Sequence, residues 1–121
     1  MIHEDYVTLE QAKKLKQLGY DGEYHCYYVV NSCDGKYLST PQIASIFEDD
    51  LNAPDLYEVA TWLRDKHRLA VIVKLNGLRT MWFTEIWTMT PNGPVYNDPG
   101  VLFESYEEAL SHGISKALEL L

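Results

Sequence analysis

The chain has 121 residues, 46% of them hydrophobic, which predicts one globular domain over residues 1–121 and excludes a disordered tail, a fibre or a disulfide-packed miniprotein. No run approaches the ~18 apolar residues of a membrane span. Ten Lys and Arg against eighteen Asp and Glu give a net charge of −8, so direct binding to negatively charged nucleic acids is not expected.

The first predicted element is a helix that begins after Thr8. Gln11 follows three residues later, which is the spacing of a capping box, and Gly19 is a typical helix C-terminal stop. Residues 24–30 are aromatic and β-branched, so a strand is expected there. A helix and a strand therefore open the chain.

The next stretch gives weaker signals. Residues 31–35 are turn-like and precede a short extended segment at 36–38. Thr40 and Pro41 then favour a short helix over residues 41–47, because proline is common at the first helical position. Residues 48–50 and 52–54 are expected to form a solvated connection.

A second long helix is predicted from Asp55 to His67. Asp55 and Glu58 repeat the capping-box spacing, and apolar residues recur at helical intervals behind them. The period then changes to two, which predicts strands at 69–75 and 79–90 joined by an Asn-Gly turn.

The pairing of this hairpin decides which side chains share a face. A three-residue loop would place the following pairs on one face: Val71 and Val73 opposite Phe83 and Met81. The other face would then hold Ile72, Trp82 and Ile86. A slip of one residue would exchange the faces, so the register is the sensitive point of this prediction.

A short strand at 95–96 and a final helix complete the chain. Ser105 and Glu108 have capping-box spacing, and apolar residues at i, i+3, i+4 and i+7 continue to Leu121. Clustered antiparallel strands without βαβ alternation predict an α+β fold, a small antiparallel sheet with an aromatic hairpin packed against helices.

Two parts of the sequence resemble uncharacterised phage and mobile-element proteins of gut anaerobes. Residues 56–67 (LYEVATWLRDKH), the aromatic hairpin and residues 105–110 (SYEEAL) resemble the "phage ABA sandwich" type over about 55–121. Residues 6–21 resemble the openings of mobile-element proteins. The resemblance implies a helix–sheet–helix sandwich and a mobile-element origin, and it implies no catalytic activity.

The aromatic residues suggest how the protein acts. Nine Tyr and three Trp exceed what one small core encloses, and these residues are enriched where proteins meet partners. Tyr28, Trp82 and Trp87 are the candidate binding residues. The leading hypothesis is therefore a non-enzymatic protein that binds a protein partner or forms a homodimer.

Two other hypotheses stay open. The first is an acidic inhibitor that imitates DNA and binds a nucleic-acid-binding enzyme. Its acidic face would consist of Glu48, Asp49 and Asp50, extended by Asp55 and Glu58 at the start of the next helix. The second is a small-ligand binder or small enzyme built on Glu85 or His67. If Glu85 is buried inside its aromatic strand, its pKa is expected to rise, as that of a functional acid does; the alternative is a solvent-facing position that discourages strand-to-strand aggregation.

Cofactor and compartment follow from the cysteines and the N-terminus. His25, Cys26 and Cys33 lack the paired spacing of a structural zinc site, so no metal or other cofactor is expected. No nucleophile elbow or phosphate-binding glycine loop occurs, and no catalytic residues are assigned. The N-terminus lacks a secretory signal, so we expect a cytoplasmic protein with reduced thiols and no membrane anchor.

Overall fold

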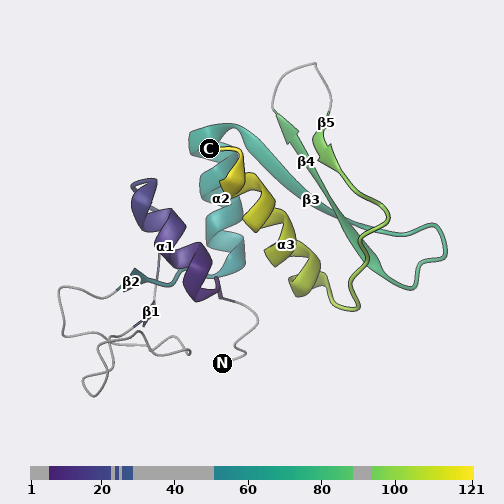
Figure 1. Ribbon diagram of the computed structural model, residues 1–121, viewed down its shortest axis with the longest axis horizontal. Helices are drawn as coiled ribbons and strands as arrows, with labels where there is room; N and C mark the ends of the chain where they lie inside the picture. Colours follow the sequence, from purple (N-terminus) through teal and green to yellow (C-terminus); the bar gives the residue numbers. More distant parts are fainter. Residues whose placement is uncertain (1–5, 23, 25, 29–50, 89–93) are drawn as a thin grey trace. The chain divides into compact units, whose positions relative to one another are not determined.

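The computed structural model describes residues 6–22, 24, 26–28, 51–88 and 94–121 (Figure 1). Contacts divide the chain into two compact units, Met1–Glu58 and Val59–Leu121, which are described separately. The described residues contain three helices, one two-stranded and one three-stranded antiparallel sheet, so the predicted α+β class is confirmed.

In the first unit, helix α1 (Leu9–Gln17) begins and ends as its sequence predicts. The Thr8 hydroxyl accepts a 3.2 Å hydrogen bond from the Gln11 backbone, and the Gln11 side chain accepts a 2.8 Å bond from the Thr8 backbone. Gly19 takes the left-handed conformation with φ of 75°, and the N–H of Tyr20 bonds back to the carbonyl of Leu15.

Strands β1 (Tyr27–Tyr28) and β2 (Leu51–Asn52) form the small antiparallel sheet of this unit. The strand expected at 24–30 is confirmed at its centre. Ala53, expected in a solvated connection, is instead 0% exposed, because its N–H donates to the Cys26 carbonyl at 2.8 Å and holds the segment against the first strand. Leu51, which pairs with Tyr28, is 3% exposed. The turn, extended segment and helix expected at 31–47 lie outside the described residues.

Helix α2 (Leu56–His67) starts at the end of the first unit and continues into the second. Its capping box is confirmed: the backbone of Glu58 donates to the Asp55 carboxylate at 2.7 Å, and the backbone of Asp55 donates to the Glu58 carboxylate at 3.0 Å. One residue, Arg68, joins α2 to the next strand. Its φ of 58° is left-handed, which reverses the chain within a single residue.

The sheet of the second unit has the order β3–β4–β5, with β4 in the centre (Figure 1). The three strands are β3 (Leu69–Leu75), β4 (Trp82–Thr88) and β5 (Pro94–Asn97). The expected hairpin register is wrong by three residues: Val71 pairs with Ile86 rather than with Phe83. Side chains alternate between the two faces along a strand, so a shift by an odd number of residues exchanges the faces of β4 relative to β3. Trp82 and Ile86 therefore share a face with Val71, and Ile72 lies on the other face.

The longer hairpin loop explains this shift. The Asn76 side-chain oxygen accepts hydrogen bonds from the backbones of Thr80 (2.9 Å) and Met81 (3.3 Å), and the Asn76 N–H donates to the Met81 carbonyl at 2.9 Å. Arg79 takes a left-handed φ of 57° inside the loop. The loop between the paired residues Asn76 and Met81 therefore has four residues, 77–80, whereas a loop of three residues was expected.

Helix α3 (Tyr106–Glu119) covers one face of this sheet, which we call the inner face. Ser105 caps it by accepting a 3.0 Å hydrogen bond from the Glu108 backbone. The absence of a side chain at Gly113 permits the close approach, since a Cβ there would overlap Thr84 and Val71. The second helical layer implied by the phage-type resemblance stays a prediction.

Candidate functional site

The face of the sheet opposite α3 carries the candidate site. Strand alternation places alternate residues of β3 and β4 there, away from the buried contacts of Val71 and Thr84 with α3. We call this the outer face, and its residues are Ala70, Ile72, Lys74, Phe83, Glu85 and Trp87.

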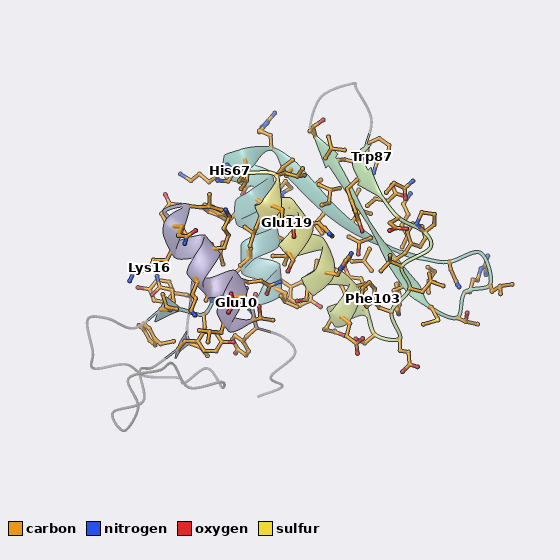
Figure 2. All side chains as sticks on the ribbon, in the orientation of Figure 1. Glu10, Lys16, His67, Trp87, Phe103 and Glu119 are labelled. Carbon is orange, nitrogen blue, oxygen red and sulfur yellow. The ribbon has the colours of Figure 1, made fainter. Side chains whose placement is uncertain are left out.

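The outer face is apolar and partly exposed. Ile72 is 36% exposed, whereas Phe83 and Trp87 are half-buried, with Trp87 towards the end of β4 (Figure 2). Aromatic and branched side chains held at this exposure on a rigid sheet are typical of protein-contact surfaces.

A charged pair lies within this apolar face. The Lys74 ammonium is 3.0 Å from Glu85 Oε1, and the Trp87 indole N–H donates to Glu85 Oε2 at 2.7 Å. Glu85 is only 6% exposed. Burial acts to raise the pKa of its carboxyl, but the hydrogen bonds from Lys74 and Trp87 and the Lys74 charge outweigh burial, so the net pKa is lowered.

This arrangement bears on the hypothesis of a functional acid at Glu85. Glu85 is buried, as that hypothesis requires. Its pKa is lowered rather than raised, so the carboxylate is ionised near neutral pH and both of its oxygens accept from neighbouring side chains. Such a group positions Lys74 and Trp87; it is not poised to donate a proton.

The three aromatic candidates are placed in three different environments. Trp87 lies on the outer face. Trp82 lies on the inner face, where its ring meets that of Tyr106 edge-on at 5.3 Å. Tyr28 is 1% exposed in the first unit, its hydroxyl donates to the Val7 carbonyl at 2.7 Å, and burial raises its pKa. Trp87 therefore shares the outer face with Phe83 and Ile72, and the other two candidates do not lie on this face.

The acidic candidates Glu48, Asp49 and Asp50 lie outside the described residues. The two carboxylates expected to extend that face, Asp55 and Glu58, bond to each other's backbone at the start of α2. Capping therefore accounts for these two acids, and the acidic face as a whole stays a prediction.

His67, the other residue of the enzyme hypothesis, lies at the end of α2 (Figure 2). Its ring contacts Trp62 edge-on, with ring centroids 4.5 Å apart. Cys26 is 1% exposed. Within the described ranges, no three His, Cys, Asp or Glu side chains come together as metal ligands would.

A second polar cluster was not found by sequence reasoning. His112 on α3 lies 3.0 Å from the Tyr96 hydroxyl of β5, and its ring packs 5.0 Å from that of Phe103. Burial, followed by the Lys116 charge, lowers the pKa of His112, and burial raises the pKa of Tyr96. The residues are sixteen positions apart, so only the sheet–helix packing brings them together.

No protein family, curated protein or solved structure matches this chain. Among the helices of the described residues, none is both long and apolar enough to cross a membrane.

Proposed function

We propose that this protein acts without catalysis, by binding a protein partner through the outer face of its three-stranded sheet. The observation that carries the proposal is the partly exposed apolar surface that Ile72, Phe83 and Trp87 form around an internally satisfied ion pair. We further propose a cytoplasmic accessory role in a phage or mobile element, which the resemblance of residues 55–121 supports.

The ion pair favours contact with a protein over capture of a charged small molecule. Both Glu85 oxygens already accept hydrogen bonds from Lys74 and Trp87, so the face offers little unsatisfied charge to a ligand. A partner with a complementary apolar surface gains from covering the aromatic rings without having to break the pair. Depletion of free charge around aromatic side chains is a feature of interface centres.

Affinity capture from the source cell tests the proposal. Wild-type protein, Trp87→Ala and Tyr57→Ala would be immobilised at equal density, and retained proteins would be quantified by mass spectrometry. Tyr57 is the matched control, since it is an aromatic residue 49% exposed on α2 rather than on the sheet.

We expect a partner to be retained by the wild type and by Tyr57→Ala, and to be reduced about tenfold with Trp87→Ala. Circular dichroism would show that both variants are folded. Equal retention by all three proteins, or loss with Tyr57→Ala alone, contradicts a binding site on the outer face.

A further inference from the structure

The two edges of the three-stranded sheet differ in their protection against pairing. Strand β5 has four residues, begins with Pro94, and is offset by a register irregularity between Ile86 and Trp87 of its neighbour. Short length, proline and bulges are the usual devices that prevent an edge strand from pairing with another chain.

Strand β3 at the opposite edge lacks these devices. It has seven residues, contains no proline, and pairs with β4 in unbroken register from Leu69 to Leu75. Its one charged residue, Lys74, is engaged by Glu85 of its own sheet. Among the residues that the structure describes, no strand pairs with the other side of β3.

Two sets of hydrogen bonds fix which backbone groups of β3 point to this open edge. The Asn76 N–H donates to Met81, so these residues form a hydrogen-bonded pair of the antiparallel ladder. Both backbone groups of Trp82 bond to Phe103 at 2.8 Å, so Trp82 faces away from its β3 neighbour, Leu75.

Because hydrogen-bonded and non-bonded pairs alternate, these observations divide β3 into two sets. The backbones of Ala70, Ile72 and Lys74 face β4. The backbones that face the open edge belong to Leu69, Val71, Val73 and Leu75. The second set is arranged symmetrically about Ile72.

We propose that two copies of this chain pair antiparallel through their β3 edges, with a two-fold axis at Ile72. In this register Leu69 of each copy pairs with Leu75 of the other, and Val71 pairs with Val73. All four outward residues of each strand then form hydrogen-bonded pairs. A slip of two residues would leave one outward residue of each strand without a pair, and a slip of one would oppose outward groups to inward ones.

The side chains are self-complementary in the same register. Leucine meets leucine and valine meets valine on the inner face, while Ile72 meets its own copy on the outer face. Ala70 lies opposite Lys74, and its small side chain leaves Lys74 room to remain 3.0 Å from Glu85. Residues 61–121, which contain β3, carry six basic and seven acidic side chains, so this half of the chain is nearly neutral.

The pairing rests on the backbone of β3 and does not depend on the outer face binding another protein. It joins two three-stranded sheets into one of six strands, and it makes the two outer faces continuous. Strand-edge contacts alone are smaller than a standard interface, so the dimer is expected to dissociate on dilution.

The two-fold axis at Ile72 allows a charge-exchange test with full-length protein. Ile72→Lys and Ile72→Glu each place like charges opposite one another, and each is expected to weaken self-association about tenfold or more. An equal mixture of the two variants places opposite charges there, and we expect dimers to return. Sedimentation equilibrium over a dilution series measures all four samples, and near-ultraviolet circular dichroism verifies the fold.

Cysteine crosslinking supplies a second measurement. Residues in a non-hydrogen-bonded antiparallel pair have Cα atoms about 4.5 Å apart, within the range of a disulfide. Ile72→Cys should therefore crosslink rapidly on mild oxidation, whereas Leu78→Cys in the hairpin loop, 82% exposed, should not. The wild-type protein is the control for crosslinking through Cys26 and Cys33.

Restored dimers in the mixture and rapid crosslinking at position 72 would support the proposal. A wild-type protein that is monomeric at millimolar concentration overturns it, as does a dimer unaffected by both charged variants. Trp87→Ala separates this proposal from the proposed function: it should remain a dimer in sedimentation even if it fails to capture a partner.

Discussion

The hydroxyl of Thr84 in the middle of β4 donates a 2.7 Å hydrogen bond to the backbone carbonyl of Ala109 on α3. Thr84 is 1% exposed, so this bond satisfies a polar group within the contact between sheet and helix. Thr84→Val keeps the shape and removes the bond. We expect the free energy of unfolding to fall by about 1 kcal/mol, measured by chemical denaturation. An unchanged denaturation midpoint would show that the bond contributes nothing.

Gly113 provides a test of the same contact in which two effects oppose each other. Alanine is favoured over glycine inside a helix by about 1 kcal/mol, so Gly113→Ala would stabilise an exposed helix. Here the added Cβ would overlap the Thr84 and Val71 side chains. We expect net destabilisation of about 1–3 kcal/mol by thermal or chemical unfolding. A stabilised variant would mean that α3 can move away from the sheet at no cost.

The position of α3 could be predicted from sequence, whereas the hairpin register could not. The α3 face from Ala109 to Leu118 is buried where the helical period places it, because that period is read from local spacing. The register depends on the Asn76 carboxamide and on Arg79 in a left-handed conformation. Arginine gives no sequence signal for that conformation, and the neighbouring Gly77 suggested a tighter turn.

Glu85→Gln tests the ion pair of the outer face. The folded-state pKa of Glu85 lies below its ordinary value of 4.5, so the pair stabilises the protein above that pH, and the stabilisation is lost as the pH falls through the folded-state pKa. Lys74 is about half exposed, so solvent screens the pair and we expect a difference of about 1 kcal/mol at neutral pH. Denaturation of both proteins at several pH values should show the curves converging in acid.

We expect His112 to make the second unit less stable in mildly acidic solution. Its folded-state pKa lies below the ordinary value of 6.5, because burial and the Lys116 charge disfavour the charged ring more than Asp98 and Glu119 favour it. The contribution of His112 to the free energy of unfolding is therefore fully present above pH 6.5, and it is lost as the pH falls through the folded-state pKa.

His112→Gln keeps a partner for the Tyr96 hydroxyl and cannot titrate. The difference in unfolding free energy between wild type and His112→Gln should change below pH 6.5, while the contributions of the other histidines cancel. A constant difference from pH 7.5 downwards would contradict the lowered pKa.

Asn76→Ala tests the hairpin loop. The substitution removes the side-chain oxygen that accepts from the Thr80 and Met81 backbones, so we expect a loss of about 1 kcal/mol and faster amide hydrogen exchange at these two residues. Asn97→Ala is the control, because Asn97 is an exposed asparagine on β5 outside this loop. Equal effects of both variants would rule out a specific role for Asn76.

The sequence predicts an aromatic contact surface, which stays a prediction, but it does not show which of the aromatic residues share a face. Of the three aromatic candidates, Trp87 is half-buried on the outer face. Tyr28 is buried by pairing with Leu51, which lies 23 residues further along the chain. The Lys74–Glu85 pair depends on the register that the sequence did not reveal, and the His112–Tyr96 pair depends on tertiary packing.

Strand β3 is anchored at both ends. At one end, Arg68 is the only residue between α2 and the strand. At the other end, the Asn76 N–H donates a hydrogen bond to the Met81 carbonyl. A strand held at both ends in this way cannot change its register with β4 without breaking one of these connections. Insertion of one residue next to Arg68 should therefore be far more disruptive than insertion next to Leu78 at the exposed tip of the loop.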